Sequence, residues 1–384
     1  MRGHVAKKGN RYYAVVYEGT DTATGRQRHR WYPGGETRKE AERVLGDLVK
    51  RLHDGDYRAP ERITLGDYLV ERWLPIRKNQ LKKSTFSGYR GSIRNHVVPR
   101  IGSIQLQKLT SEDLDRFYAD LLDNGRLNGG GGPLSSKTVR SIHAMLHKAL
   151  ADACRKGTLQ RNVADLADPP RVRVGRGRGM KVWNAEQVRQ FLTEIDHHRL
   201  APAYYVSANT GMRRGEVLGL RWSDVDFDAA RLSVHEAVLN VEYEVGIDSV
   251  KSDAGRRTID LDSRTVAVLR SWRKTQREER LALGLRVAEH DHVFAKADGR
   301  ALHPDYFSQV FERHVEKSEL PRIRLHDLRH THATILLKAG VPVKVVSERL
   351  GHSSPAFTMS VYQHVLPGMQ ADAAAKFSEA VFGE

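Results

Sequence analysis

Cysteine is almost absent from the sequence, since Cys154 is the single example in 384 residues. One thiol excludes a disulfide within the chain and a cysteine-rich zinc site, and it suits a reducing compartment. No run of about eighteen apolar residues occurs, so we expect no membrane-spanning helix and no membrane partner. The first residues, MRGHVAKKGNRYY, also lack the apolar stretch of a secretory signal. These absences predict a cytoplasmic protein.

Acidic residues are too few to balance the basic ones. The 63 Lys and Arg against 47 Asp and Glu give a formal net charge of +16. A surplus of this size favours a polyanionic partner, above all nucleic acid, although a basic enzyme unrelated to nucleic acid is the alternative. The segment RVRVGRGRGMK (171–181) combines basic residues with glycine and no acid. We expect this strap to follow DNA phosphates through four arginines: Arg171, Arg173, Arg176 and Arg178.

The hydrophobic patterns predict a multidomain chain that is mainly α with small β-sheets. Residues 1–60 contain two expected strands, 11–19 and 27–34, and a helix that opens at the capping box TRKE (37–40). Three arginines of the second strand, Arg26, Arg28 and Arg30, would project from one face of the sheet near Trp31 and suit DNA contact. A merely solvated strand is the alternative.

The rest of the chain divides into two larger regions joined by a linker. Residues 64–168 show helical periodicity throughout, and residues 169–182 form the basic linker. Residues 183–384 mix helices with two expected strands, 231–239 and 256–261, which flank a loop carrying Lys251. The end of the chain is expected to form a tail helix with an apolar stripe made of Ala374, Phe377, Ala380 and Val381. This stripe would dock on a neighbouring subunit, and folding back on its own domain is the alternative.

The stretch RLHDLRHTHAT (324–334) concentrates histidine and arginine on one expected helix. His326 and His330 stand four apart, as in zinc sites, whereas His326 and Arg329 stand three apart and could face a phosphate. A zinc hydrolase of the His-Glu-x-x-His type would need glutamate after His326, where Asp327 stands. A cationic arginine would also repel a metal ion. We therefore predict a phosphate clamp, no metal site and no cofactor, with His330 and His332 as buried, hydrogen-bonded structural residues.

Three more stretches have the same character: TGMRRGE (210–216), VKSDAGRRTIDL (250–261) and LGHSSPAFTMSVYQHV (350–365). Together with HDLRHTHAT they resemble, in order and spacing, the motif boxes of the tyrosine recombinases of the phage integrase family. The resemblance implies an N-terminal arm-type DNA-binding domain (1–60), consisting of a β-sheet plus a helix. It also implies a helical, SAM-like core-binding domain (64–168) and an α+β catalytic domain (183–384).

The resemblance also implies a role for each motif residue. Tyr362 would attack a DNA phosphodiester, Arg213 and Arg329 would bind its non-bridging oxygens, and His352 would donate another hydrogen bond. Lys251 would protonate the departing 5′ oxygen, although Arg256 and Arg257 lie close enough to be alternatives. His326 would assist proton transfer, and Glu216 would orient Arg213. General chemistry agrees, because a phenol with a pKa near 10 needs a cationic site and a positioned base to act at neutral pH.

The implied activity is site-specific recombination, that is, integration and excision of a phage genome or mobile element in a bacterial host cell. The implied partners are double-stranded DNA attachment sites, a homotetramer acting through a Holliday junction, and possible accessory proteins such as an excisionase or a host DNA-bending protein. Three alternatives are a type IB topoisomerase, a DNA-binding architectural protein without catalysis, and a metal-dependent nuclease. The separate N-terminal unit argues against the first, and the full set of motif residues argues against the second.

Overall fold

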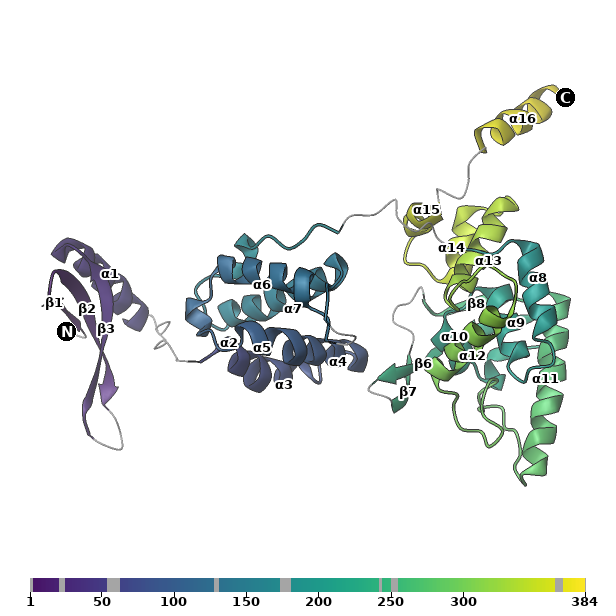
Figure 1. Cartoon of the computed structure of the whole chain (residues 1–384), viewed down its shortest axis with the longest axis horizontal. Coiled ribbons are helices and arrows are strands. Elements are labelled where there is room, and N and C mark those ends of the chain that lie inside the picture. Colours follow the sequence, from purple (N-terminus) through teal and green to yellow (C-terminus); the bar gives the residue numbers. More distant parts are fainter. Residues whose placement is uncertain are drawn as a thin grey trace. The chain divides into compact units, whose positions relative to one another are not determined.

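The chain is described by a computed structural model (Figure 1). The described residues are 3–20, 25–53, 63–127, 131–172, 181–241, 244–249, 255–362 and 369–383. Two compact units, Met1–Val174 and Gly175–Glu384, account for the chain. The finer division into three domains and a linker stays a prediction. Within the described ranges, no helix is both long and apolar enough to cross a bilayer.

The chain begins with a three-stranded antiparallel sheet in the order β1-β2-β3. Its elements are β1 (Gly3–Lys8), β2 (Arg11–Thr20), β3 (Gln27–Gly35) and the helix α1 (Arg38–His53). The two expected strands are confirmed, and β1 adds a strand that the sequence did not signal. The capping box opens α1 as expected, because the backbone N–H of Glu40 donates to Thr37 Oγ1 over 3.3 Å and the N–H of Thr37 donates to Glu40 Oε2 over 3.1 Å.

Helix α1 covers one face of this sheet. A Cβ added to Gly3 would lie 2.7 Å from Leu45 of α1, so glycine permits the close approach of helix and strand. Gly3 pairs with Val16, and Val16 is fully buried. Residues paired across strands share a face, so the side of the sheet that carries Val16 is the side on which α1 packs.

The described residues of 63–127 and 131–172 are mainly helical, as predicted for 64–168. Their helices are α2 (Leu65–Asp67), α3 (Leu74–Arg77), α4 (Lys83–Ser92), α5 (Val98–Ile101), α6 (Ser111–Asn124) and α7 (Ser136–Arg155). Helix α6 starts from a capping box in which Thr110 and Asp113 exchange hydrogen bonds. The long helices α6 and α7 bury apolar faces against α2 and α5, and this core includes Trp73, Phe117 and Leu146.

The second unit contains a three-stranded antiparallel sheet and a separate hairpin. The sheet has the order β4 (Val225–Asp226), β5 (Arg231–Val234) and β8 (Arg257–Asp260), and the hairpin pairs β6 (Glu236–Val241) with β7 (Glu244–Ser249). The single strand expected over 231–239 is therefore divided at His235. Strand β6 leaves the sheet because it packs on Gly215 and Gly219, where a Cβ would lie 2.6 and 2.9 Å from carbonyl oxygens of β6.

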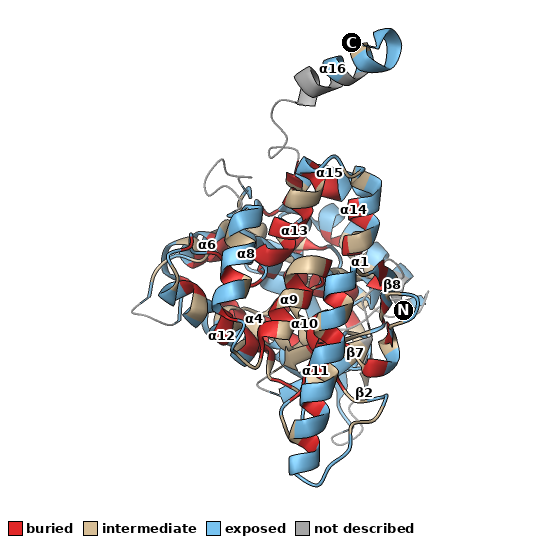
Figure 2. Cartoon of the chain, turned by 90° about the vertical axis from the view of Figure 1, so that its right-hand side faces the viewer, coloured by how far each residue is buried: buried red, intermediate tan, exposed pale blue. Residues whose placement is uncertain are grey.

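Helices make up the rest of this unit. They are α8 (Ala185–Glu194), α9 (Ala201–Thr210), α10 (Arg214–Gly219), α11 (Ser263–Ala282), α12 (Pro304–Lys317), α13 (Asp327–Lys338), α14 (Val343–Leu350), α15 (Pro355–Tyr362) and α16 (Met369–Phe382). Aromatic side chains form much of the core, with Phe191 and Tyr204 packed against Phe311. Helices α9 and α13 are largely buried, whereas α16 exposes Phe377 and Val381 (Figure 2).

Candidate active site

Arg213 stands at the start of α10, immediately after the turn that ends α9. Gly211 makes this turn in the left-handed region, with φ of 64°. The backbone N–H of Arg213 donates to Glu216 Oε2 over 2.9 Å, and its Nη1 donates to Glu216 Oε1 over 2.7 Å. Its Nη2 donates to the carbonyl oxygen of Gly351 over 3.0 Å. The guanidinium is thus oriented from two sides while its side chain stays 43% exposed.

Glu216 is buried between two arginines. Besides Arg213, it accepts a hydrogen bond of 2.8 Å from Nη2 of Arg257. Burial raises the pKa of Glu216, but the hydrogen bond and charge of Arg257, together with Arg213, outweigh it and leave the pKa lowered. Glu216 therefore stays ionised and orients Arg213, which is the role that the sequence reading gave it. Arg257 also donates from Nε to the carbonyl of Arg349 over 2.7 Å and from Nη1 to the carbonyl of Gly255 over 3.2 Å, so all three of its guanidinium nitrogens have partners within the fold.

Arg329 enters the same region from the first turns of α13. Its Nη1 donates to the carbonyl oxygen of Gly211 over 2.7 Å. Its Nη2 is buried and has no hydrogen-bond partner among the described residues. Burial and the like charge of Arg213 lower the pKa of Arg329 to about 9. A buried guanidinium nitrogen without an acceptor is costly, so this group is arranged to receive an anion.

His352 follows the turn at Gly351, which accepts the hydrogen bond from Arg213. Its Nδ1 lies 2.8 Å from Oγ1 of Thr358, a fully buried residue of α15. Burial and the charges of Arg329 and Arg213 lower the pKa of His352 to about 3. The ring is therefore neutral at pH 7. When the Thr358 hydroxyl donates to Nδ1, the proton resides on Nε2, which can then donate a hydrogen bond.

Tyr362 ends α15 and is 1% exposed. Its phenolic oxygen lies 2.8 Å from Nδ1 of His330, and the two rings are 5.7 Å apart between centroids. Burial raises the pKa of Tyr362 to about 12, although the charge of Arg329 opposes this rise. Burial and the neighbouring His326 lower the pKa of His330 to about 4. The phenol and the imidazole are therefore both neutral at pH 7.

His326 and His332 have different surroundings on α13. The ring of His326, exposed at the first turn, meets the ring of His330 edge to face with centroids 5.1 Å apart. His332 is buried, and its Nδ1 lies 2.9 Å from the carbonyl oxygen of Ala208. Arg349 donates from Nε to Nε2 of His332 over 3.2 Å. His332 is thus the buried, hydrogen-bonded residue that the sequence predicted, whereas the bond from His330 to Tyr362 is one that sequence reasoning missed.

The predicted residues meet around one centre. Arg213 is bonded to Gly351, the residue before His352, and Arg329 is bonded to Gly211, two residues before Arg213. Tyr362 is bonded to His330, the residue after Arg329, so these groups are close in space. They come from α10, α13, the turn after α14, and α15. Lys251 lies outside the described residues, so its predicted role stays a prediction. Among the residues that the structure describes, no group of three or more His, Cys, Asp or Glu side chains could hold a metal ion.

The DNA-binding role of the seven arginines named from the sequence stays a prediction. Arg28 and Arg30 share a face of β3, but Arg30 pairs with Val16 and so faces the side on which α1 packs. Trp31 lies on the opposite face. Arg26 precedes β3 and is exposed. In the basic strap Arg171 is exposed, and three residues lie outside the described ranges: Arg173, Arg176 and Arg178.

The open face of the N-terminal sheet carries aromatic side chains. Trp31 pairs with Val15, and its ring meets that of Tyr13 at 5.8 Å between centroids. The rings of Tyr17 and His29 lie 5.5 Å apart. Val15 is 1% exposed although α1 packs on the other side, whereas Trp31 is 49% exposed. An exposed aromatic face of this kind suits contact with a nucleic acid.

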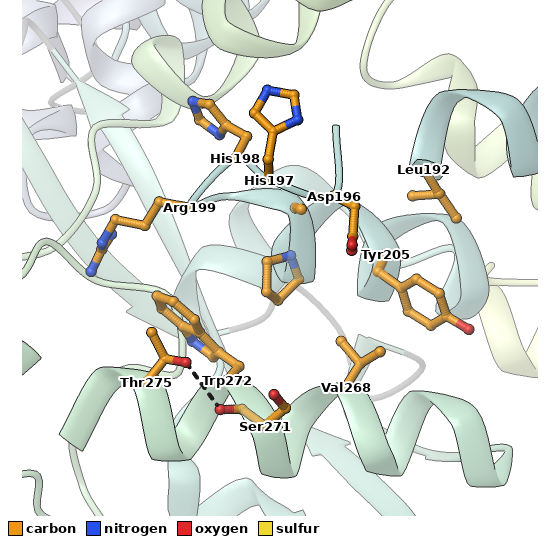
Figure 3. Close-up of a pocket in the computed structure, with 12 residues that line it drawn as sticks. Leu192, Asp196, His197, His198, Arg199, Tyr205, Val268, Ser271, Trp272 and Thr275 are labelled. Carbon is orange, nitrogen blue, oxygen red and sulfur yellow. Dashed lines mark hydrogen bonds between the residues drawn. The ribbon is translucent and has the colours of Figure 1, made fainter. Parts of the chain in front are cut away.

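The second unit also contains a pocket, which is drawn in Figure 3. Residues of α8, α9, α11 and the loop between α8 and α9 line it, among them His198, Tyr205 and Trp272. Its arginine, Arg199, is already engaged, because Nε and Nη2 donate to the carboxylate of Glu279 over 2.8 and 2.7 Å. The pocket shares no lining residue with the cluster around Tyr362.

Two segments of the chain match families of known proteins. Residues 181–368 match the phage integrase family, and residues 64–122 match the N-terminal SAM-like domain of phage integrases. A XerC-like tyrosine recombinase of Caldanaerobacter subterraneus is 28% identical over 387 residues, covering 96% of each chain. The ICEBs1 integrase of Bacillus subtilis is 28% identical over 378 residues, covering 98% of this chain and 99% of the relative.

Solved structures share the fold. The Tn1549 transposon integrase in complex with a circular intermediate DNA matches with a TM-score of 0.66 at 22% identity, covering 82% of this chain and 99% of that one. The lambda integrase tetramer bound to a Holliday junction matches with a TM-score of 0.56 at 18% identity, covering 91% of this chain and 96% of that one. The predicted fold class, mainly α with small sheets, is confirmed.

Proposed function

The chain belongs to the phage integrase family of tyrosine recombinases, and we propose that it integrates and excises a phage genome or another mobile element at double-stranded DNA attachment sites. It is a site-specific recombinase, which breaks and rejoins DNA strands. The observation that carries the assignment of its site is the convergence of two guanidinium groups and a buried phenol within one chain. Arg329 matters most, because its Nη2 is buried beside Tyr362 and Arg213 with no described partner.

The geometry supports a defined role for each group. Tyr362 Oη attacks the scissile phosphorus, which leaves a 3′-phosphotyrosine and a free 5′-hydroxyl. Arg213 and Arg329 donate hydrogen bonds to the non-bridging oxygens, because planar guanidinium groups match the charge that spreads over them in the transition state. Nε2 of His352 offers a further donor.

Two further steps complete the reaction. Lys251, by resemblance to the family, protonates the departing 5′ oxygen. The covalent ester to Tyr362 keeps the energy of the phosphodiester bond, so rejoining needs no nucleotide cofactor.

DNA is the partner, and its contacts divide along the chain. We assign arm-site binding to residues 1–60, core-site binding to 64–168 and chemistry to 183–384. On the first of these the open face around Trp31 and Tyr13 carries the contact, helped by Arg26. The strap over 169–182 follows the backbone.

The assembly we propose is a homotetramer on DNA in the cytoplasm of a bacterial host. The exposed apolar stripe of α16, with Phe377 and Val381, docks on a neighbouring subunit. We also propose an excisionase or a host DNA-bending protein as an accessory partner.

A nicked suicide substrate tests the chemistry directly. The substrate is a duplex made from the junctions between the mobile element and the chromosome, nicked so that the short 5′-hydroxyl strand diffuses away after cleavage. We expect a covalent protein–DNA adduct that forms in EDTA and is lost in Tyr362→Phe. An adduct formed by Tyr362→Phe would refute the assignment of the nucleophile. Removal of residues 1–60 should weaken binding to the element ends and leave adduct formation measurable.

A further inference from the structure

His330 lies between the nucleophile and the histidine of the family motif. Its Nδ1 is 2.8 Å from the phenolic oxygen of Tyr362, and its ring is in edge-to-face contact with His326 at 5.1 Å between centroids. The hydrogen-bond partner of the nucleophile is thus the residue after Arg329, one helical turn beyond His326. Nothing in the roles given above uses this histidine.

The direction of the hydrogen bond follows from the states of its two ends. A buried phenol with a raised pKa keeps its proton at neutral pH, and an imidazole with a lowered pKa is unprotonated on one nitrogen. The phenolic O–H therefore donates to Nδ1, and the proton of the neutral ring is on Nε2. This arrangement orients the proton of Tyr362 toward a base before DNA binds.

We propose that His330 is the immediate acceptor of the Tyr362 proton and is therefore a catalytic residue of the strand-cleavage step. The proposal rests on the proposed function, because it concerns the same nucleophile. As the bond from Oη to phosphorus forms, the O–H bond breaks and its proton moves to Nδ1. The bond from phosphorus to the 5′ oxygen breaks, and that oxygen takes a proton from Lys251, the acid proposed above for this step. On rejoining, the imidazolium of His330 returns its proton to the departing phenol.

Geometry favours His330 over His326 for this transfer. General base catalysis needs the base within hydrogen-bond distance of the proton that it removes, and His330 meets this condition without any movement. His326 is exposed and its ring meets that of His330 edge to face, so it is placed to exchange a proton with His330 or with solvent. The two histidines then form a path from the buried phenol to the surface.

The charges around His330 allow an imidazolium once DNA is bound. The groups that act on it are the neighbouring His326, the carboxylate of Asp327, and the guanidinium groups of Arg329 and Arg324. Asp327 favours the protonated ring, whereas Arg329 and Arg324 oppose it. A phosphodiester anion on Arg329 offsets that opposing charge, so substrate binding itself makes His330 a stronger base.

A purely structural role for His330 makes a different prediction. If the residue only holds Tyr362 in place, a side chain that accepts the same hydrogen bond should support cleavage. His330→Asn provides this case, because an amide oxygen near the position of Nδ1 accepts the phenolic O–H and takes up no proton at neutral pH. His330→Ala removes both functions and leaves space for a small base.

The experiment measures single-turnover adduct formation on the nicked junction duplex by the full chain. We expect His330→Asn and His330→Ala to be slower than the parent chain by about 100-fold or more, the usual contribution of a general base. Added imidazole should restore His330→Ala in part and leave His330→Asn unchanged. His332→Asn is the matched control, since it changes a histidine of the same helix that contacts Ala208 and Arg349 instead of Tyr362. DNA binding, measured in parallel, should be equal in all four proteins.

A substrate with sulfur in place of the bridging 5′ oxygen distinguishes loss of the general base from loss of the general acid. A thiolate leaves without a proton, so this substrate should rescue a variant that lacks the acid and leave the defect of His330→Asn in place. Rates for His330→Asn within threefold of the parent chain would overturn the proposal. So would rescue of that variant by the sulfur substrate, or a failure of imidazole to act on His330→Ala. Absence of any adduct with the parent chain would instead count against the proposed function.

Discussion

Nη1 of Arg329 donates to the carbonyl oxygen of Gly211 over 2.7 Å, across 118 residues of sequence. This bond fixes one side of the guanidinium and aims the other side, Nη2, into a buried region where no described residue accepts from it. The two terminal nitrogens of this side chain thus have different roles. Nη1 bonds to the main chain of the fold, and Nη2 is available to bind the substrate.

Replacing Arg329 should separate stability from activity. We expect Arg329→Met to slow adduct formation by a factor of about 100 to 1,000, which is the usual loss when one preorganised hydrogen-bond donor is removed. The same change removes a buried charge whose pKa is already lowered to about 9, so the thermal midpoint should stay the same or rise. Calorimetry and the suicide substrate measure the two effects. A large fall in the midpoint would show that Arg329 is a structural residue instead.

Glu216 offers a test of charge balance. Glu216→Gln leaves Arg257 and Arg213 without their shared carboxylate, and breaking a buried ion pair in this way costs about 3–5 kcal/mol. We expect lower stability in urea and slower cleavage. The double variant Glu216→Gln with Arg257→Met removes the stranded charge and should recover stability without recovering cleavage. If stability and the cleavage rate recover together, Glu216 contributes to cleavage only by stabilising the fold.

Gly211 should tolerate no side chain. Its φ is +64°, and an added Cβ would lie 2.7 Å from Leu350 and 2.8 Å from His332. Gly211→Ala should therefore destabilise the second unit and displace the carbonyl that holds Arg329. Gly340→Ala is the control, since its φ is +80° with nothing within 4 Å of the added Cβ, and it should cost only the backbone strain of about 1–2 kcal/mol. Equal losses in the two variants would contradict this explanation.

The N-terminal sheet should bind DNA through its open face. We expect Trp31→Ala to weaken binding of element-end DNA at every salt concentration without changing the salt dependence. Arg26→Ala, in contrast, should lower the slope of log K against log salt by about 1, as loss of one phosphate contact does. Fluorescence anisotropy from low to high salt measures both. Unchanged DNA binding by Trp31→Ala would show that the open face of the sheet does not contact the DNA.

Acid should destabilise the second unit through His332. Burial and Arg349 lower the pKa of His332 to about 3 in the folded chain, whereas an unfolded histidine has a pKa near 6.5. The unfolded state therefore binds more protons between these values, and the free energy of unfolding falls as pH drops below about 6.5, by up to about 1.4 kcal/mol per pH unit. Hydrogen exchange of α13 in the parent chain and in His332→Asn should show a steeper pH dependence in the parent.

Local chemistry made much of this fold predictable. Helix starts were readable where a side chain satisfies the first free N–H groups, as Thr37 and Glu40 do for α1. The motif residues Arg213, Arg329 and Tyr362 could be named because their spacing resembles a family. Strand β1 was missed because GHVAKK has little alternation of apolar and polar residues and depends on pairing with β2.

Other features depend on contacts between distant segments. The division of one expected strand at His235 follows from glycines of α10 that admit β6, which no strand pattern can reveal. The choice of face for Arg30 depends on where α1 packs. The bond between His330 and Tyr362 joins residues 32 apart on different helices, so a histidine read as structural lies against the nucleophile. Spacing indicates which residues share an element and says little about what faces them.

The two arginines of the site are held by main-chain oxygens of glycine turns, Gly211 for Arg329 and Gly351 for Arg213. Every residue has a main-chain carbonyl group. These two hydrogen bonds therefore require a particular backbone conformation at each turn and place few demands on the neighbouring side chains. Evolution can therefore change the surrounding helices while the chemical centre keeps its shape.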